Sequence, residues 1–353
     1  VTPGPAPAKG NVVPHESGTT LRLLLPVAAS ICNDVDVDAK GRLPDRPLEP
    51  MLGEMKAHGV IFSQDKPPFT MTGRLQGGNF SMVGDVSSQF FSGLLLAAPQ
   101  IGLSTITSTT PLQSSDYVTL TTETMRDFGV EVEHTLPDTN INEAFTVPFG
   151  ASFIGRDNYQ IEGDWSNAAI WMVAAGMTGK PITITGMNKN SVQADRRIMQ
   201  VMIDAGCDVV WDGMNITVTG RASKPIHADL EQMPDMLPVM AALACSISGE
   251  SSFVKGARLR LKESDRLVAV ANLVRDLGGT VREEGDDLYI IGSGILKGGQ
   301  GDCVNDHRLV MTGTLMALIS ENPVTLQDSE AITKSYPDFF EDWNLLGGNA
   351  QPL

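Results

Sequence analysis

One type of segment, a polar start followed by an apolar run, recurs five times along the chain. This repeat constrains the fold more than any other feature. Each copy has a polar start rich in Gly, Asp, Ser or Asn and continues with about ten small and apolar residues. The copies begin at Glu16, Gly84, Gly163, Met233 and Asn305. Polar residues of this kind cap helix N-termini, and a helix that is apolar on nearly all faces is buried. Each copy therefore predicts a capped, buried helix.

The spacing of the copies predicts a repeated subdomain. Asp164, Asp235 and Asp306 follow one another at intervals of 71 residues, whereas solenoid repeats span roughly 20–50 residues. Amphipathic segments between the copies end in Gly and continue with β-branched residues, which predicts a helix, a glycine cap and a strand. The repeat unit of this α/β chain is thus β-α-β-α-β-β.

Five copies do not divide evenly between two similar domains, whereas six would. We therefore expect two lobes, residues 1–161 and residues 162–353, with the first repeat of the first lobe depleted. If the buried helices of a lobe run parallel, their N-termini share one end and attract anions. The simpler alternative is that the polar residues there only cap their helices.

The composition argues against several classes of partner. The 353-residue chain carries a net charge of −16, so it has no basic surplus to neutralise nucleic-acid phosphates or an anionic membrane surface. No run approaches ~18 apolar residues, so no membrane span is predicted. The four cysteines lie far apart and the five histidines show no metal-ligand spacing, so no metal site is expected. Scattered cysteines are typical of a reducing compartment, and a cytoplasmic protein is expected.

The segment RLRLKESDRL is rich in charged side chains although the chain as a whole is acidic. Its alternation is strand-like, which predicts that Arg258, Arg260 and Lys262 share one face. Arg266 then falls in the first turn of a helix, where a cation opposes the helix dipole. An anionic ligand beside the cation would explain this placement. The alternative is a solvated charge cluster, with Ser264 as the helix cap.

The segment NDHR repeats this arrangement, because His307 and Arg308 also lie at the predicted start of a helix. A second set of cations at a helix N-terminus again favours an anionic ligand.

GARLRLKESDRL resembles the Lys-Glu-Ser/Thr-Asp-Arg motif of the 5-enolpyruvylshikimate-3-phosphate (EPSP) synthases. Other segments agree with that family in order and spacing, namely ESGTTLR, GRLPDRPLEP, GDVSSQF, MPDMLP, NDHR and ITKSYPDFF. These seven motifs extend the resemblance from about Val12 to the C-terminus.

The resemblance implies a two-domain enolpyruvyl-transferase fold, an inside-out α/β barrel with three β-α-β-α-β-β units in each domain. It implies a reaction in which phosphoenolpyruvate and shikimate 3-phosphate give 5-enolpyruvylshikimate 3-phosphate and phosphate, in the pathway to the aromatic amino acids. Members of the family are the target of glyphosate. Neither a metal nor an organic cofactor is implied, and a monomer is expected.

The resemblance also implies roles for individual residues. Asp235 matches the base that acts on the attacking hydroxyl, and Glu263 matches the proton donor, with Lys334 as its partner. The residues that match substrate-binding positions are Gly18, Arg46, Ser87, Ser88, Gln89, Ser114, Arg258, Lys262, Arg266, His307 and Arg308. The simpler alternatives are that Asp235 caps a helix and that Glu263 forms an ion pair with Lys262 or Arg266.

Among these positions the family pattern separates the two substrates. Three serines and Lys262 match the site for the shikimate phosphate, and Gln89 matches a position between the substrates. Arg46, Arg266, Arg308 and Lys334 match the site for phosphoenolpyruvate, to which Gly18 contributes backbone.

The chain departs from the family at three places. No Lys-Ser-x-x-x-Arg motif precedes ESGTT, Arg258 stands where many relatives have Asn, and Ser115 and Asp116 stand where relatives often have Lys-Pro. We therefore expect a further segment upstream of Val1, without which the chain is expected to be inactive or nearly so. The alternatives are UDP-N-acetylglucosamine enolpyruvyl transferase, which shares the fold and the enolpyruvyl donor, and a non-catalytic truncated fragment.

Overall fold

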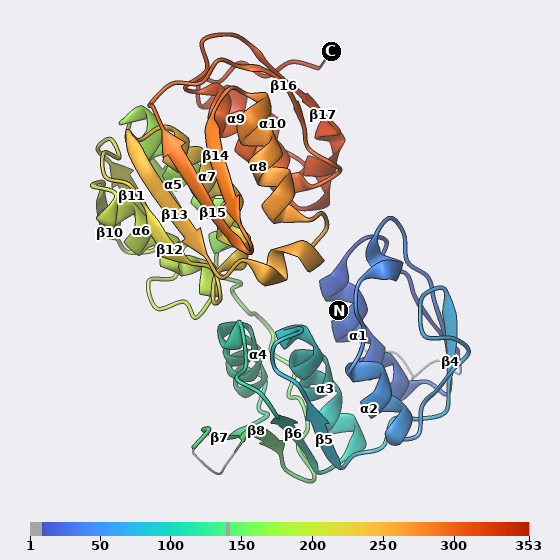
Figure 1. Cartoon of the computed structure of the whole chain (residues 1–353). Helices are drawn as coiled ribbons and strands as arrows, with labels where there is room; N and C mark the ends of the chain where they lie inside the picture. Colours follow the sequence, from blue (N-terminus) through green and yellow to red (C-terminus); the bar gives the residue numbers. More distant parts are fainter. Residues whose placement is uncertain (1–8, 139–141, 353) are drawn as a thin grey trace. The chain divides into compact units, whose positions relative to one another are not determined.

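The structure is a computed structural model that describes residues 9–138 and 142–352. The chain divides into two compact units, Val1–Gln160 and Ile161–Leu353, shown in Figure 1. Each unit has its own hydrophobic core of buried side chains. Within the described ranges, no helix is both long and apolar enough to span a bilayer.

The first unit contains two sheets and four α-helices in its described residues. Its elements are β1 (Lys9–Val12), α1 (Gly18–Ile31), β2 (Asp34–Val37), the 3-10 helix η1 (Leu43–Asp45), α2 (Met51–Ala57), β3 (Ile61–Phe62), β4 (Phe69–Thr72), β5 (Asn79–Met82), α3 (Ser88–Ile101), β6 (Ser104–Ser108), α4 (Ser115–Asp127), β7 (Glu133–Thr135) and β8 (Glu143–Val147).

The two sheets of this unit have the same topology. Their strand orders are β1-β2-β4-β3 and β5-β6-β8-β7. In each, the first two strands are parallel and the remaining pairs are antiparallel. A parallel pair needs a crossover connection, which α1 supplies between β1 and β2 and α3 supplies between β5 and β6. A short loop is enough to connect antiparallel strands such as β3 and β4. The unit thus contains two copies of the predicted β-α-β-α-β-β repeat.

The second unit begins with a helix. Its elements are α5 (Trp165–Thr178), β9 (Ile182–Ile184), η2 (Ala194–Arg197), α6 (Ile198–Asp204), β10 (Asp208–Asp212), β11 (Asn215–Thr219), β12 (His227–Asp229), η3 (Pro234–Met236), α7 (Leu237–Cys245), β13 (Gly249–Val254), η4 (Ala257–Leu261), α8 (Arg266–Asp276), β14 (Thr280–Glu284), β15 (Asp287–Gly292), β16 (Gly299–Asp302), α9 (His307–Ala317), β17 (Val324–Gln327), η5 (Ser329–Lys334) and α10 (Phe339–Leu345).

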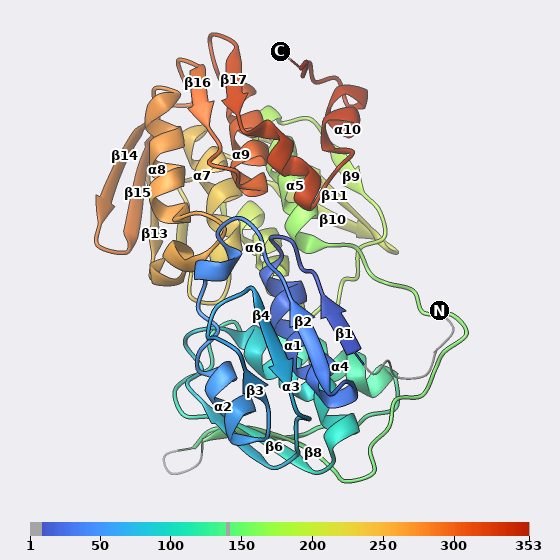
Figure 2. The same cartoon turned by 90° about the vertical axis from the view of Figure 1, so that its right-hand side faces the viewer.

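One sheet of the second unit is a full copy of the repeat, with order β12-β13-β15-β14. The other two described sheets, β10-β11-β9 and β16-β17, each contain part of that pattern. Figures 1 and 2 show α5, α7 and α9 on the inner side of these sheets. The helices therefore form the centre of the unit and the strands its outer layer.

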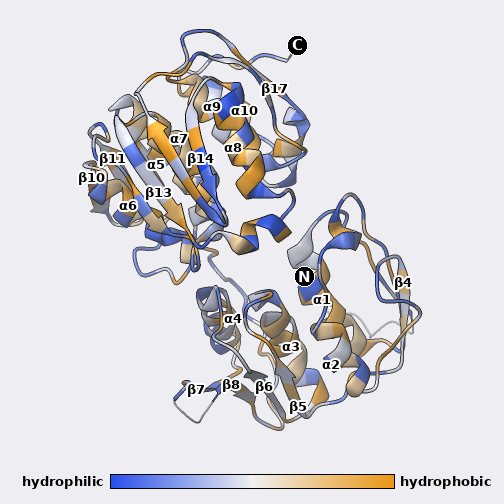
Figure 3. Ribbon diagram, in the orientation of Figure 1, coloured by the Kyte–Doolittle hydropathy of each residue, from blue (hydrophilic) through white to orange (hydrophobic). Residues whose placement is uncertain are grey.

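The predicted burial of the repeated helices is confirmed for α7, in which every residue is buried. Figure 3 shows the apolar colouring of the inner helices. The prediction is wrong for α1, where Leu24 is 42% exposed. The buried residues of α1 recur three and four positions apart, which places them on one stripe of an amphipathic helix.

The predicted polar caps are present on four of the five repeated helices. Ser17, Ser87, Asp164 and Asp306 each accept a hydrogen bond from a backbone N–H in the first turn that follows. At the fifth, a 3-10 turn precedes α7, and no side chain caps either element. Asp235 lies within that turn, so its carboxylate is not a helix cap.

The strand predicted for Arg258–Lys262 is wrong, because Ala257–Leu261 forms the 3-10 helix η4. Lys255 has a φ of 62°, and the Gly256 N–H donates to the carbonyl of Asp286, so the chain turns here. Leu259 is fully buried whereas Leu261 is 47% exposed, although a strand would place both on one face. The cap of α8 is Asp265 and not Ser264, because the Asp265 side chain accepts a hydrogen bond from the Val268 N–H.

Helices α1 and α3 approach each other closely at Gly93. A Cβ at Gly93 would lie 2.4 Å from the carbonyl oxygen of Arg22 and 3.3 Å from Cγ of Pro26. Pro26 has no N–H to donate to that carbonyl, which leaves its oxygen free of the usual helical hydrogen bond. Arg22 can therefore keep its position only if residue 93 is a glycine.

Gly93→Val is expected to lower the free energy of unfolding by roughly 1–3 kcal/mol, because overpacking forces the two helices apart. The measurement is denaturant-induced unfolding. Gly155→Val is the matched control in the same unit, because no atom lies within 4 Å of a Cβ there. Equal stability of the two variants would contradict the close approach.

Candidate functional site

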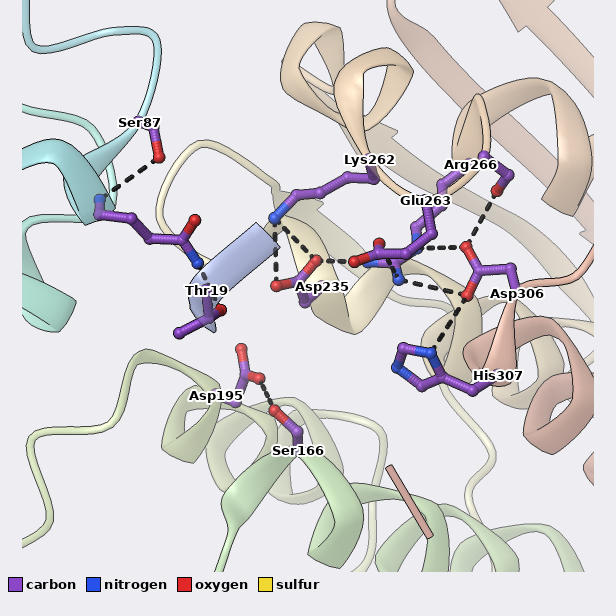
Figure 4. Close-up of polar contacts among 12 residues, drawn as sticks. Thr19, Ser87, Ser166, Asp195, Asp235, Lys262, Glu263, Arg266, Asp306 and His307 are labelled. Carbon is purple, nitrogen blue, oxygen red and sulfur yellow. Dashed lines mark hydrogen bonds and ion pairs between the residues drawn. The ribbon is translucent and has the colours of Figure 1, made fainter. Parts of the chain in front are cut away.

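The second unit holds a buried network of ion pairs centred on Arg266, the first residue of α8 (Figure 4). Its guanidinium lies 2.8 Å from Asp306, 2.6 Å from Asp235 and 2.6 Å from Glu263. The Arg266 side chain is 2% exposed. Burial disfavours the charge, but the carboxylates of Asp306, Glu263 and Asp235 outweigh it, so the pKa of Arg266 is raised. The cation at this helix start is thus balanced by carboxylates of the protein itself.

Asp306 joins the starts of two helices. It caps α9 by accepting a hydrogen bond from the Arg308 N–H at 3.0 Å, and it binds Arg266 of α8 through both carboxylate oxygens. The Ser264 hydroxyl donates to it at 2.9 Å. Burial acts to raise the pKa of Asp306, but Arg266 outweighs it and the pKa is lowered. This side chain is therefore an ionised link between α8 and α9.

Asp235 lies between two cations of the charged segment. Lys262 Nζ is 3.0 Å from one of its oxygens and 3.2 Å from the other, and Arg266 bonds to the first oxygen. Burial acts to raise the pKa of Asp235, but Lys262, Arg308 and Arg266 together hold it well below its usual range. Asp235 is consequently a carboxylate at neutral pH.

Lys262 differs from Arg266 in that its pKa is lowered and not raised. Burial lowers its pKa, with the charges of Arg266 and Arg258 adding to the effect and Asp235 opposing it. Its side chain is 19% exposed, so it is accessible to an anion that replaces Asp235 as its partner.

The start of α9 carries the remaining predicted residues of this unit. His307 lies beside Asp306, and burial followed by the charge of Arg308 lowers its pKa to about 4. His307 is therefore neutral at pH 7. Lys334, the last residue of η5, donates from Nζ to the carbonyl of Asn305 at 2.7 Å, which places its ammonium at the loop before α9.

In the first unit, a second buried arginine organises two of the predicted residues. Arg22 of α1 donates to Gln89 Oε1 at 3.0 Å and to the Ser87 hydroxyl at 3.5 Å. It also donates to the carbonyl of Pro47 at 2.9 Å and lies over the Phe90 ring. Gln89 Nε2 then donates to the Thr19 hydroxyl at 2.7 Å (Figure 4). Arg22 thereby fixes which end of the Gln89 amide is the donor toward Thr19.

The other predicted residues of the first unit also lie at helix starts. Gly18 begins α1, and a Cβ there would meet Nη1 of Arg46 at 2.7 Å, so the guanidinium lies against this glycine. Ser88 begins α3. Ser114 precedes α4 with a left-handed φ of 52° and is 2% exposed. Such backbone strain at a serine is common at ligand-binding sites.

The structure thus links Asp235, Lys262, Glu263 and Arg266 directly, and the ion pair expected as the simpler alternative for Glu263 is present. Gly18 lies beside Arg46 in the first unit. Arg258 lies on η4, where its charge acts on Lys262.

The sequence interpretation missed Arg22 and Asp306. Arg22 is a lone cation in an otherwise apolar helix, which was a usable signal. Asp306 repeats the 71-residue interval, but its role depends on a partner 40 residues away. In the described ranges, no three His, Cys, Asp or Glu residues are grouped so that they could hold a metal.

Asp306→Asn is expected to lower the free energy of unfolding by about 3–5 kcal/mol at pH 7, because it leaves Arg266 partly unpaired in the core. Since the folded pKa of Asp306 is lowered, its contribution is present above the unfolded pKa and is lost as pH falls through the folded pKa. The difference from wild type should therefore shrink in acid.

Urea unfolding at pH 7 and at successively lower pH measures this difference. Asp276→Asn, at an exposed position at the end of α8, is the control and should leave stability nearly unchanged. Wild-type stability of Asp306→Asn at pH 7 would contradict the assignment of Asp306 as the link.

The chain is similar to proteins of one family along nearly its whole length. The pattern of the EPSP synthase (3-phosphoshikimate 1-carboxyvinyltransferase) family matches residues 5–343. A 3-phosphoshikimate 1-carboxyvinyltransferase of Clostridium kluyveri is 36% identical over 96% of this chain and 79% of its own length. One of Methanocorpusculum labreanum is 34% identical over 97% of this chain and 80% of its own length.

Solved structures agree with the sequence relatives. EPSP synthase from Acinetobacter baumannii is 25% identical and superimposes with a TM-score of 0.75 over 95% of this chain and 78% of its own. The enolpyruvyl transferase NikO from Streptomyces tendae is 18% identical with a TM-score of 0.71, over 94% of this chain and 76% of its own, which supports the fold alone. The predicted enolpyruvyl-transferase fold is therefore confirmed, and the chain belongs to the EPSP synthase family.

Proposed function

We propose that this protein transfers the enolpyruvyl group of phosphoenolpyruvate to the 5-hydroxyl of shikimate 3-phosphate and releases phosphate. The observation that carries the proposal is the Asp235 carboxylate held between Lys262 and Arg266, beside Glu263. The similarity to named 3-phosphoshikimate 1-carboxyvinyltransferases favours this acceptor over UDP-N-acetylglucosamine and over a non-catalytic role.

Asp235 is the proposed base toward the attacking hydroxyl. It is ionised, so it can accept a proton, but two cations at 3.0 Å or less make it a weak base. If Lys262 binds the phosphate of shikimate 3-phosphate, Asp235 loses one of these cations and its pKa rises toward a more useful value. Acceptor binding then strengthens the base at the moment the base is needed.

Glu263 is the proposed proton donor to the methylene carbon of phosphoenolpyruvate, with Lys334 as its partner. In the present arrangement Glu263 is paired with Arg266 at 2.6 Å. Such pairing favours the carboxylate, so the acid form requires that this ion pair loosens when substrate is bound. The later removal of a proton, as phosphate leaves, needs the carboxylate form again.

The charges of phosphoenolpyruvate are proposed to be bound by Arg46, Arg308 and Lys334, with backbone N–H groups at Gly18. These groups suit an anion because guanidinium and ammonium donors form charge-assisted hydrogen bonds with carboxylate and phosphate oxygens. Arg266 belongs to the same proposed set. Hydrogen bonds to Asp306 and Asp235 use three of its five N–H groups. A substrate oxygen can therefore bind a remaining N–H or displace Glu263, whose carboxylate lies 2.6 Å from Nη2.

The phosphate of shikimate 3-phosphate is proposed to bind Ser87, Ser88 and Ser114 together with Lys262. All three serines are buried, and two of them lie at the start of α3, where N–H groups favour an anion. Gln89 is proposed to contact both substrates, with His307 and Arg258 as further contacts.

The remaining expectations stay predictions. They are a division into domains at residues 1–161 and 162–353, a monomeric state, a cytoplasmic location and a reaction without metal or organic cofactor.

The proposed reaction predicts release of inorganic phosphate from phosphoenolpyruvate only when shikimate 3-phosphate is the acceptor. The assay compares this acceptor with UDP-N-acetylglucosamine, using the product of the complete reading frame and the 353-residue chain. Release with the nucleotide sugar would show the alternative transferase, and no release with either acceptor would reject both.

Asp235→Asn is expected to lower kcat by roughly 10²–10⁴, the usual contribution of a positioned general base. Binding of shikimate 3-phosphate, measured by calorimetry, should persist because Lys262 remains and loses a competing partner. Asp229→Asn removes an exposed carboxylate of β12 and is the control. A kcat of Asp235→Asn within a few fold of wild type would remove Asp235 from the mechanism.

A further inference from the structure

Arg22 of α1 has no role in the reaction proposed above, yet its side chain contacts two residues that do. The residue is 5% exposed. Its Nη1 donates to Gln89 Oε1 at 3.0 Å and to the Ser87 hydroxyl at 3.5 Å. Both acceptors lie at the start of α3. One buried guanidinium is therefore bonded to two side chains of the proposed substrate site.

The guanidinium is itself held in place by groups outside that segment. Its Nη2 donates to the carbonyl of Pro47 at 2.9 Å. Its Cζ lies 5.2 Å from the centre of the Phe90 ring, a distance at which a cation and an aromatic face attract each other. The N–H groups of a guanidinium lie in one plane, so bonds from both Nη1 and Nη2 fix its orientation. Arg22 is thus a fixed donor toward Gln89.

Arg22 decides which end of the Gln89 amide faces Thr19. A guanidinium only donates, so it can bond to the amide oxygen and not to the amide NH₂ group. The Thr19 hydroxyl bonds to the other end, Nε2, at 2.7 Å (Figure 4). A hydroxyl can donate or accept and would therefore bond to either end of an amide. Arg22, and not Thr19, keeps the donor end of Gln89 at the start of α1.

This orientation matters for the binding of an anion. Nε2 of Gln89 carries two N–H groups and the bond to Thr19 uses one, so the second can donate to an oxygen of a bound anion. In the reverse orientation the amide oxygen would face that anion and repel it. Gly18, whose backbone is proposed to bind phosphoenolpyruvate, directly precedes Thr19. The donor end of Gln89 thus lies beside a proposed anion site.

We propose that Arg22 is a positioning residue for substrate binding: by bonding to Oε1 it holds the Gln89 amide with its N–H groups turned toward the anionic substrate. Arg22 acts through Gln89 and not by contact with the substrate. The inference rests on the proposed function only for the identity of that anion, and shikimate 3-phosphate is the probe.

The test is a double-mutant cycle on the binding of shikimate 3-phosphate, measured by calorimetry with the full-length protein and without phosphoenolpyruvate. Arg22→Met removes the donors and keeps an unbranched side chain. It should weaken binding about three- to tenfold, the range that one hydrogen bond contributes. In the Gln89→Ala background the same substitution should change the dissociation constant by less than about twofold, because the group through which Arg22 acts is absent.

A role in stability alone gives a different result. Arg22→Met would then lower the melting temperature and weaken binding by the same factor in both backgrounds. Arg22→Lys keeps the charge and a donor, so it should bind more tightly than Arg22→Met, and it carries the same cycle if Arg22→Met does not fold. Arg126→Met, in the last turn of α4 where the side chain is 55% exposed, is the matched control and should leave binding unchanged.

The orientation of the amide can also be measured in the ligand-free protein. With isotope-labelled glutamine, the side-chain N–H groups of Gln89 should show a nuclear Overhauser contact with the Thr19 methyl group, and Arg22→Met should weaken it. An unchanged contact, or equal factors in the two backgrounds, would overturn the proposal. A protein that shows the contact and its loss, yet binds no shikimate 3-phosphate, would retain the positioning of Gln89 and lose the proposed function.

Discussion

The ion pair between Arg266 and Asp306 is the interaction on which the second unit most depends. Both side chains are almost fully excluded from solvent, and the pair joins the first turns of α8 and α9. An isolated charge at either position would be strongly unfavourable in the core, so each requires the other. Through the same guanidinium the pair also fixes Asp235 and Glu263. Loss of one partner would therefore disturb the fold and the proposed catalytic carboxylates together.

The first unit also has a buried arginine at the centre of a polar network, but the groups bonded to it differ. Arg22 is also a buried guanidinium on a repeated helix, but its bonds go to the amide of Gln89, the hydroxyl of Ser87 and a backbone carbonyl. These three acceptors are neutral, whereas Arg266 lies against three carboxylates. The carboxylates around Arg266 suit proton transfer.

The repeat made much of the architecture predictable. Polar residues ahead of apolar runs correctly indicated capped helices, because a cap and a buried face are local properties of the chain. The segment from Arg258 to Lys262 was not predictable in this way, because a positive φ at Lys255 and contacts with Asp286 override its alternating pattern. The amphipathic character of α1 was missed because nothing in its leucine-rich run distinguishes the exposed Leu24 from the buried Leu21 and Leu25.

By itself, the sequence determined the repeat, the caps and the identity of the charged residues, since these depend on spacing along the chain. Only the tertiary structure decided which charges neutralise one another. Arg266 looked like a free cation awaiting an anion, and it proved to be enclosed by carboxylates, one of them 40 residues away. Burial sets the strength of every charge interaction, and burial is a property of the assembled core.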